Sequence, residues 1–481
     1  MTDNEKLGWG IKIGFGLGDL FGGGSMVVVG FFYLYFLTDV ILISPALAGT
    51  VFLVSKCWDA VSDPIMGIIS DRTRTRFGRR RPYFLAGVIL IFLAFFLMWY
   101  PINFQQEIHR FIYVLIAYVF FSTVWTIVMI PYFSLSSELT TNYNERTSLV
   151  TVRVFFSHFS SLVCAVVPLE IVRQFPDERT GYMAMAITVG LFFALPYIVV
   201  FLSTRERKEF QKKPQPFNIQ KSFISPFRTP TFVNVLFIYL FSFVTMDVVM
   251  SIIMYFMTYY MKRSGETSFV LGTLCILQIV ALPIFWFISK KTSKKTSLMV
   301  GAVLMLIVMS ASFLITPDGH AMILYFFAAL IGLGTGGVIV MIYSIFPDVP
   351  DVDELYSGIR QEGIYSGLLT FMRKLGSALG IFIVSQFLSL AGYKKPIEQT
   401  VDGVSKLVKQ QQTPEFLMIL KLVFALVPVV FLSICIFNLV RYRLTPEIHS
   451  RLDALLNLKR RGESHDKAEE ETLKKLLEGK T

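Results

Sequence analysis

Two aspartates lie one helical turn apart in a stretch that is otherwise mostly apolar. Asp59 and Asp63 belong to the segment KCWDAVSDP, within the run SPALAGTVFLVSKCWDAVSDPIMGIIS. Residues four apart share one face of a helix, so both carboxylates point the same way. Two like charges in apolar surroundings repel each other, and they persist when a cation lies between them or when one is protonated. Hard cations prefer such oxygen ligands.

Each aspartate also has a structural explanation. Asp63 precedes Pro64 near the end of the expected helix, where it would serve as a cap or pair with a following arginine. Lys56, which we expect near the helix boundary, is another partner for either acid. Asp59 lies deeper in the run, and a charge at the bilayer centre costs about 2.5–3.5 kcal/mol on insertion scales. The residues therefore favour a cation site over a simple salt bridge.

Composition indicates the surroundings of this pair. The chain has 481 residues, of which 54% are hydrophobic and 16% charged, against about 25% charged in soluble proteins. Apolar runs of roughly 20 residues predict an all-α polytopic membrane protein, because β-barrels have short alternating segments instead. The four cysteines lie at irregular spacing inside apolar runs, which fits neither a disulfide framework nor a zinc site. No ATP-binding loop, catalytic triad or metal cluster is visible, so we expect neither an enzyme nor a cofactor.

We expect twelve transmembrane helices. Their predicted ranges are 11–38, 46–70, 82–100, 110–135, 149–172, 181–203, 231–261, 267–289, 297–316, 321–346, 361–391 and 415–441.

Basic residues in the connections predict the orientation. They concentrate in DRTRTRFGRRRP (71–82), in the long connection after residue 203 and in SKKTSKK (289–295), which all face one side if the count of twelve is right. The positive-inside rule places that side, and both termini, in the cytoplasm. The net charge of +11 then reflects topology and contact with anionic lipid, and it does not indicate a nucleic-acid partner.

The long basic connection divides the chain into two similar parts. We predict an N-terminal six-helix half over 1–203, a cytoplasmic loop over 204–230, a C-terminal half over 231–441 and a charged cytoplasmic tail over 442–481. A duplicated 6+6 arrangement is typical of secondary transporters that bind their substrate near the membrane midplane between the halves.

The pattern GxxxDRxxxRxGRR after the second span resembles the cytoplasmic signature of the major facilitator superfamily. A plain positive-inside anchor would explain its arginines, but not Asp71, which can lock against a neighbouring helix. We therefore expect Asp71, Arg72 and Arg79 to have gating or structural roles. Asp348 and Asp351, in FPDVPDVDEL at the end of span 10, are expected to pair with loop arginines as a latch.

The stretches YFLTDV, WDAVSDPIMG and TRTRFGRRRPY together resemble the glycoside–pentoside–hexuronide:cation symporters, whose best-known member is melibiose permease. The resemblance runs from span 1 to span 11 and implies the major facilitator fold. It implies that Asp59 and Asp63 bind the coupling Na⁺, Li⁺ or H⁺, with Thr126 as a third oxygen ligand. It also implies that Lys374 on span 11 couples the cation and substrate sites, so Lys374→Gln should impair transport more than Lys56→Gln.

The sequence departs from this family where a sugar would bind. Aligned on the quoted motifs, Gly23 and Met129 stand where melibiose permease carries two sugar-binding aspartates, and Phe133 replaces a tryptophan. Buried sugar hydroxyls need polar partners, so these changes argue against a melibiose-type galactoside. The PDVxDxDEL stretch and the apolar replacements also resemble the vertebrate sodium-dependent lysolipid transporter. The predicted substrate pocket contains Asp19, Gly23, Met129, Phe133, Arg153, Thr370 and Lys374.

Two further charges lie inside expected spans. Asp247, near the middle of span 7, is either a buried acid bonded to a neighbouring helix or part of the transport site. Arg373 adjoins Lys374 but points about 100° away around the helix, which suggests an interfacial position.

The prediction that follows is a monomeric, multi-pass protein of a bacterial inner membrane that carries a small organic solute together with a cation. By the family default the solute is a sugar, glycoside or hexuronide, and the alternative is a lysolipid-like amphiphile. A sensor or scaffold on the same fold is the hypothesis from a different class, and it gives no reason to retain Asp59, Asp63 and Lys374.

Overall fold

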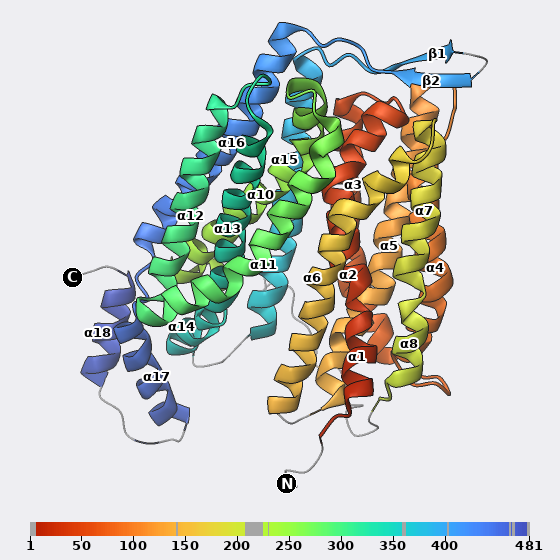
Figure 1. The fold of residues 1–481 in the computed structure, drawn as a ribbon. Coiled ribbons are helices and arrows are strands. Elements are labelled where there is room, and N and C mark those ends of the chain that lie inside the picture. Colours follow the sequence, from red (N-terminus) through yellow and green to blue (C-terminus); the bar gives the residue numbers. More distant parts are fainter. Residues whose placement is uncertain are drawn as a thin grey trace. The chain divides into compact units, whose positions relative to one another are not determined.

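The computed structural model describes residues 6–140, 143–206, 225–228, 230–357, 362–401, 404–460, 463 and 467–478. Each predicted apolar run forms a helix, and most ends lie within a few residues of their predicted positions (Figure 1). The first part of the chain comprises α1 (Trp9–Leu17), α2 (Asp19–Val28), the π-helical turns η1 (Val29–Tyr33) and η2 (Phe36–Val40), α3 (Pro45–Arg72), α4 (Arg81–Trp99), α5 (Glu107–Leu139), α6 (Tyr143–Arg173), α7 (Glu178–Ala194) and α8 (Pro196–Ser203).

The second part contains the remaining helices together with short 3₁₀ turns. It comprises η4 (Ser225–Arg228), α10 (Pro230–Tyr255), the π-helical turn η5 (Phe256–Tyr260), η6 (Ser264–Glu266), α11 (Thr267–Lys291), α12 (Lys294–Ala311), η7 (Ser312–Leu314), α13 (Ala321–Ile345), α14 (Asp348–Ser357), α15 (Glu362–Leu390), α16 (Pro414–Arg441), α17 (Pro446–Arg460) and α18 (Lys467–Glu478).

Eleven helical segments of the described residues are long and apolar enough to cross a membrane. The twelfth expected span is α3, which has 28 residues and is therefore long enough. It is missing from this set of apolar spans, and Lys56, Asp59 and Asp63 all lie within it. The helix that carries the predicted cation ligands is thus the one whose composition departs from that of an ordinary membrane span.

Contacts divide the chain into two compact units, and the later boundaries fall inside α10, α11, α15 and α16. The first unit comprises residues 1–214, 250–272 and 381–420, and the second comprises 215–249, 273–380 and 421–481. In the first unit α2 packs on α6, α3 on α5, and α4 on α5 and α7; in the second, α12 packs on α13.

Aromatic side chains fill much of the core of the first unit. The ring of Trp99 on α4 lies parallel to that of Tyr182 on α7, with centroids 6.0 Å apart, and within 5.2 Å of the rings of Tyr33 and Phe36. All four side chains are buried. Such rings bury a large area with few rotatable bonds, so they hold the helices that surround the charged groups in fixed positions.

An internal repeat links the two parts of the chain. Tyr35-Phe36-Leu37-Thr38 and Tyr255-Phe256-Met257-Thr258 lie 220 residues apart. Both motifs lie on π-helical turns, and each turn is followed at the same distance by a residue with positive φ, Leu42 at 63° and Lys262 at 56°. Non-glycine residues rarely adopt this conformation. Its occurrence at both equivalent positions supports the predicted duplication.

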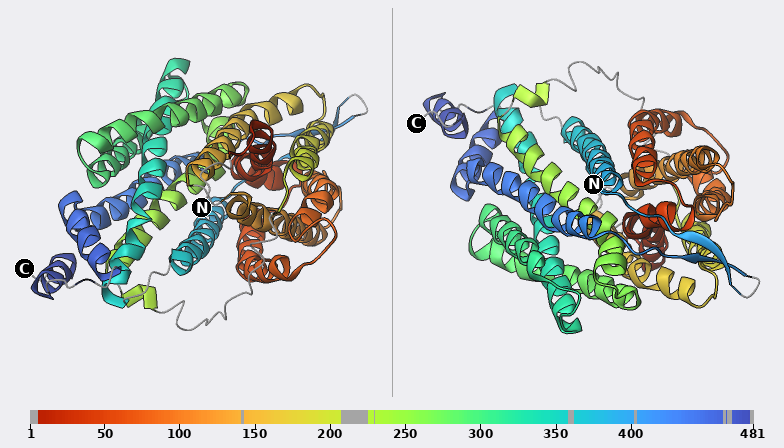
Figure 2. Two further views of the ribbon diagram at one scale, coloured as in Figure 1. Left: turned by 90° about the horizontal axis from the view of Figure 1, so that it is seen from below. Right: turned by 90° about the horizontal axis from the view of Figure 1, so that it is seen from above.

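Two features were absent from the sequence prediction. A hairpin of β1 (Ile397–Val401) and β2 (Val404–Val408) interrupts the connection between α15 and α16, with Ile397 opposite Val408. In Figure 2 it appears in blue, extending over the ends of helices of the first unit. The tail, predicted only as a charged cytoplasmic segment, contains the two helices α17 and α18, and α17 packs on α14.

Candidate functional site

Asp59 lies at the interface of α3 and α5, between a hydroxyl and an ammonium group. Its Oδ1 accepts a hydrogen bond from Ser122 Oγ on α5, and its Oδ2 lies 3.0 Å from Lys56 Nζ. Only 2% of the residue is exposed. A carboxylate removed from water in this way needs a nearby positive charge, and in this structure Lys56 supplies it.

Asp63 lies one turn further along α3 and faces a second hydroxyl of α5. Its Oδ1 accepts a hydrogen bond of 2.7 Å from Thr126 Oγ1, and Thr126 is buried. Ser122 and Thr126 have the same four-residue spacing as Asp59 and Asp63, so two hydroxyls on one helix face two carboxylates on the other. The structure thus brings together the three residues for which the family resemblance implied cation binding.

A small cavity lies beside Asp59. Its volume is about 10 Å³, which is close to the space that a single water molecule needs. Its lining residues include the charged Lys56 and Asp59 and the hydroxyl-bearing Ser122. The other lining residues are Met26, Val29, Tyr118, Phe121 and Trp125. The cavity therefore offers oxygen ligands to one small particle inside largely apolar walls.

Two features of this site differ from the sequence prediction. Lys56 was expected near the helix boundary, but α3 extends from Pro45 to Arg72, so Lys56 lies well inside it and pairs with Asp59. Ser122 was missed. Its four-residue spacing from Thr126 matches that of the two aspartates, and this spacing could have identified Ser122 from the sequence.

The residues predicted to bind substrate in the first unit form a second charged group. Arg153 Nε on α6 lies 3.5 Å from Asp19 Oδ2 on α2, and its guanidinium lies over the Phe133 ring at 5.2 Å. Asp19 is buried, whereas 23% of the Arg153 side chain is exposed. The Nε of Arg153 has no hydrogen-bond partner among the described residues. The guanidinium therefore retains donor capacity.

Gly23 and Met129, which replace the sugar-binding aspartates, lie inside the helix packing. A Cβ at Gly23 would lie 2.4 Å from Ser157 Oγ and 2.6 Å from the Ser157 carbonyl oxygen, so glycine permits close contact between α2 and α6 here. Met129 is fully buried, and its sulfur accepts a hydrogen bond of 3.1 Å from the Tyr197 hydroxyl. The side chain of Met129 is not accessible in this structure.

The remaining predicted substrate residues lie on α15 in the second unit. Thr370 is exposed and Lys374 is half-buried. Arg373, expected at the membrane interface, lies 3.7 Å from Asp247 Oδ1 on α10, with its guanidinium 4.5 Å from the centroid of the Phe243 ring. The interfacial position of Arg373 stays a prediction, and the ion pair shows that this side chain contacts α10. Asp247 is indeed an acid paired with a neighbouring helix.

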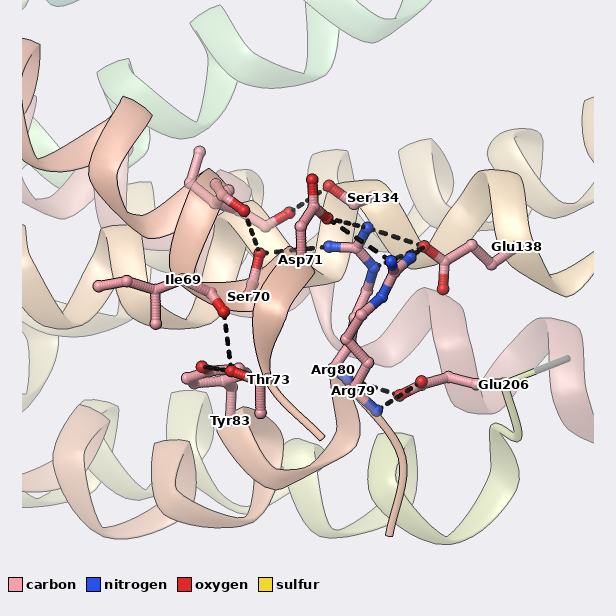
Figure 3. Close-up of polar contacts among 12 residues, drawn as sticks. Ile69, Ser70, Asp71, Thr73, Arg79, Arg80, Tyr83, Ser134, Glu138 and Glu206 are labelled. Carbon is pink, nitrogen blue, oxygen red and sulfur yellow. Dashed lines mark hydrogen bonds and ion pairs between the residues drawn. The ribbon is translucent and has the colours of Figure 1, made fainter. Parts of the chain in front are cut away.

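The basic loop after α3 folds into an ion-pair cluster within the first unit (Figure 3). Asp71 Oδ1 lies 2.9 Å from Arg80 Nη2 and 4.0 Å from Arg79 Nη1. Glu138 on α5 approaches the same two arginines at 2.5 and 2.7 Å. Asp71 thus links α3 through these arginines to the neighbouring α5. Arg72, the last residue of α3, is exposed.

Glu206 completes this cluster at the start of α4. Its carboxylate accepts hydrogen bonds from the backbone N–H groups of Arg79, Arg80 and Arg81 at 2.6, 2.6 and 3.0 Å. An anion is favourable here, since the first N–H groups of a helix lack helical partners. Arg81 donates to the Phe201 carbonyl at 2.7 Å. Structural contacts therefore account for much of the basic motif.

Among the described residues, Asp348 and Asp351 contact basic residues of α12 and of the tail, whereas loop arginines were predicted as their partners. Asp348 Oδ2 lies 2.8 Å from Lys294 at the start of α12, and its Oδ1 lies 3.6 Å from His449 of the tail. Asp351 lies 3.3 Å from Arg460, at the end of α17. The prediction did not anticipate that the tail folds back onto α14.

Sequence reasoning also missed a cluster around Asp39. The carboxylate of this fully buried residue accepts hydrogen bonds from the hydroxyls of Tyr259, of Thr38 (2.7 Å) and of Tyr393 (2.7 Å). We call this group, together with the ion pairs Lys395–Glu107 (2.8 Å), Arg179–Glu398 and Lys409–Glu178 (3.1 Å), the hairpin clasp. The clasp joins the hairpin to the ends of α5 and α7 within the first unit. In the sequence, Asp39 was noted only as part of the YFLTDV motif.

Comparison with known proteins identifies the family. The family described as MFS/sugar transport protein matches residues 14–446. The chain belongs to this family. Its membership confirms the resemblance to the glycoside–pentoside–hexuronide:cation symporters and makes this MFS protein a membrane transporter and not an enzyme.

Individual relatives of this MFS protein extend the comparison. A putative glycoside/cation symporter, YagG of Escherichia coli, is 28% identical, and the match covers 90% of this chain and 92% of that protein. The sodium-dependent lysophosphatidylcholine symporter 1-A of Danio rerio is 24% identical over 79% of this chain and 78% of its own.

A solved structure supports the fold. A bacterial homologue of the human lysosomal transporter Spinster, crystallised in an inward-facing conformation, has a TM-score of 0.64 at 13% identity and covers 92% of this chain and 96% of its own. At this identity the likeness concerns the fold alone, and the major facilitator fold predicted from the sequence is confirmed. This fold fits cation-coupled symport.

Proposed function

We propose that this protein is a symporter in which a monovalent cation, bound between Asp59 and Asp63, drives the uptake of an organic solute by alternating access. The observation that carries the proposal is the pairing of two carboxylates on α3 with two hydroxyls on α5, beside a cavity of about 10 Å³. A sensor or scaffold gives no reason to bury this arrangement, because charged groups in a membrane span are costly.

Lys56 gives the empty site a counter-charge. Its ammonium lies 3.0 Å from Asp59, so a cation entering the cavity competes with Lys56 for the same carboxylate. Pro64 frees a further oxygen ligand. A proline has no N–H, so the carbonyl oxygen of Ala60, four residues earlier, has no helical donor and can face a cation. Na⁺, Li⁺ and H⁺ are the coupling ions that such oxygens accept, and no other cofactor takes part.

The solute and the topology follow from the relatives and from the charge distribution. A sugar, glycoside or hexuronide is the primary candidate, since one relative is a putative glycoside/cation symporter. A lysolipid-like amphiphile is the second candidate, since another relative is a sodium-dependent lysophosphatidylcholine symporter. We place both termini and the Asp71 cluster on the cytoplasmic side of a bacterial inner membrane by the positive-inside rule. The working unit is a monomer, with Lys374 as the coupling residue.

Uptake into membrane vesicles under imposed Na⁺, Li⁺ or H⁺ gradients tests this function. We expect accumulation of a glycoside, uronide or lysolipid under one of these gradients, and its loss in Asp59→Asn and Asp63→Asn. Asp318→Asn, an exposed loop acid, is the matched control and should transport normally. Full concentrative uptake by both Asp59→Asn and Asp63→Asn would refute the cation site.

A further inference from the structure

A half-buried carboxylate and a partly exposed guanidinium lie together in the second unit. Asp247 is near the middle of its 31-residue span, Pro230–Tyr260, and Arg373 lies on α15. Their side chains are 17% and 32% exposed, respectively. Asp247 Oδ2 is buried and accepts no hydrogen bond from the described residues. Buried polar atoms without partners are rare in native structures and need an explanation.

This ion pair is looser than the structural ion pairs of the same protein. Arg373 Nη2 and Asp247 Oδ1 are 3.7 Å apart. The structural pairs Arg80–Asp71 and Lys294–Asp348 have separations of 2.9 and 2.8 Å, which are normal for charge-assisted hydrogen bonds. Asp247 therefore neutralises Arg373 without using its donors fully. An arginine has five N–H donors in a planar fork that fits a carboxylate or phosphate.

The internal repeat places Arg373 at the position equivalent to Arg153. The two arginines lie 220 residues apart, the same separation as Tyr35 and Tyr255. Each is paired loosely with an aspartate, at 3.5 and 3.7 Å, and each lies over a phenylalanine ring. The two parts of the chain thus contain similar charged groups, although only the arginines occupy equivalent positions, and in neither group is the ion pair as short as the structural pairs.

We propose that Arg373 binds an anionic group of the transported solute, and that Asp247 positions and neutralises this arginine in the empty carrier. This inference rests on the proposed function and deepens it by assigning the solute a negative charge. The carboxylate of a uronide and the phosphate of a lysolipid share the required chemistry.

Aromatic rings beside Arg373 fit an organic anion better than a bare ion. Phe243 lies under the guanidinium, and the ring of Tyr343 lies 6.0 Å from that of Phe243. Tyr343 is 56% exposed, whereas Tyr239, whose ring is 4.8 Å from Phe243, is buried. An exposed ring next to a guanidinium offers an apolar face to the body of a ligand whose charged end binds the arginine.

Two matched pairs of probes test the charge requirement. Methyl β-D-glucuronide and methyl β-D-glucoside differ only in a carboxylate, and lysophosphatidylcholine and monoacylglycerol differ in the phosphate-bearing headgroup. Binding to the full-length purified protein, with Na⁺ present, is measured from the rise of the unfolding temperature with probe concentration. We expect the charged member of one pair to bind at least about tenfold more tightly than its neutral partner. The pair that shows this preference identifies the source of the anion.

The variants separate an anion contact from a structural ion pair. Arg373→Gln should lose most of the charge preference, a fall of about tenfold or more, and Arg373→Lys should lose part of it because lysine lacks the fork. Asp247→Asn should keep or increase the affinity for the charged probe, since it removes a competing carboxylate. Arg441→Gln is the matched control, because Arg441 is exposed and also stacked on a phenylalanine, Phe437, at 4.2 Å. It should bind normally.

Three results would overturn the proposal. The first is the absence of any preference for the charged probe in the natural protein. The second is a preference that survives Arg373→Gln. The third is an equal loss of affinity for the charged probe in Asp247→Asn and Arg373→Gln, which would indicate a purely structural pair. If Arg373→Gln does not fold, the neutral double variant Asp247→Asn/Arg373→Gln replaces it, with stabilisation by Na⁺ as the folding control. These are equilibrium binding measurements, so a negative result would not affect the gradient-driven uptake test of the proposed function.

Discussion

At the scale of single residues, the chemistry of the cation site depends on how Asp59 is neutralised. Lys56 and Ser122 contact different oxygens of its carboxylate. Removing a buried charge's partner costs about 3–5 kcal/mol, and Lys56 is one such partner of Asp59. We therefore expect Lys56 to compete with the coupling cation for this carboxylate.

Lys56→Gln tests this competition. We expect the affinity for the coupling cation to rise by about tenfold or more, because a positive charge 3.0 Å from the ligand is removed. Net uptake should fall, since the empty carrier would return with less positive charge beside Asp59, whereas exchange of bound solute should continue. Stabilisation by Na⁺ and tracer flux measure the two effects.

Lys290→Gln, which changes an exposed lysine stacked on Trp286, is the control and should alter neither quantity. An unchanged cation affinity in Lys56→Gln would contradict the competition. The expectation that Lys374→Gln is the more harmful change stays a prediction, but its argument from Lys56 at a helix boundary no longer holds, because Lys56 lies inside α3.

At the scale of elements, charged loops and terminal helices are held by compact ion-pair clusters. Around Asp71, two arginines face two acids and a third acid binds the start of α4, so the clustered positive charges are compensated within the same unit. In the tail, α17 buries Leu452, Leu455 and Leu456, and acidic residues of α14 pair with its last arginine. Both clusters combine charge compensation with burial, which makes them stronger than isolated surface pairs.

Glu138→Ala should destabilise the first unit. Glu138 is 7% exposed and neutralises Arg79 and Arg80, so among the described residues its loss leaves Asp71 as the acid in contact with two mostly buried guanidinium groups. We expect a loss of about 3 kcal/mol in the free energy of unfolding, measured from the unfolding transition in detergent. Glu170→Ala, which breaks the exposed pair with Arg173, should cost less than about 1 kcal/mol. Equal effects would argue against a structural role of the cluster.

The tail helices should separate at low pH. Hydrogen bonds from Lys459 and Lys474 lower the pKa of Glu470 from its usual value of 4.5 to about 2. Since the folded-state pKa lies below the unfolded one, the stabilisation is complete above about pH 4.5 and is lost as the pH falls towards 2. Pepsin cleavage of the tail should therefore accelerate across this range. Glu470→Gln should remove that pH dependence, and an unchanged profile in this variant would assign the effect to other groups.

The ranges of the helices could be predicted from the sequence better than the contacts between them. Apolar runs must form helices in a membrane because backbone polar groups need internal partners, which is why the predicted ranges agree with the observed ones. The partners of Arg373 and Asp348 were not predicted because partner choice depends on neighbouring helices, on which sequence spacing within one helix carries no information. The Lys56–Asp59 pair within α3 was readable as an alternative. The spacing of Ser122 and Thr126 was readable but was not used. The hairpin has short strands whose pattern is too weak to predict.

At the scale of the whole molecule, the hairpin clasp restricts the movements that transport requires. The clasp fixes the hairpin and the end of α15 to α5 and α7 within the first unit. Alternating access requires each side of the carrier to open in turn. We therefore expect the clasp contacts to break and form again once in each transport cycle.

A cross-link across the clasp tests this expectation. Arg179 and Glu398 form an ion pair, and replacing both by cysteine in a Cys57→Ser background allows them to be joined by a bifunctional reagent. We expect the linked protein to lose solute uptake and to regain it after cleavage of the linker. The same reagent applied to cysteines at Arg451 and Glu469, a pair within the tail, should leave uptake intact. Undiminished uptake by the linked clasp would show that the hairpin does not move.

The polar content of α3 has a consequence for biosynthesis. A translocon admits a segment into lipid by its apolar character, and each central charge opposes that step by about 2.5–3.5 kcal/mol. Ser122 and Thr126 on α5, which donate hydrogen bonds to Asp59 and Asp63, are synthesised about 60 residues later. We expect the nascent chain to hold α3 at the edge of the translocon until α5 emerges, and the two helices to enter the bilayer as a pair.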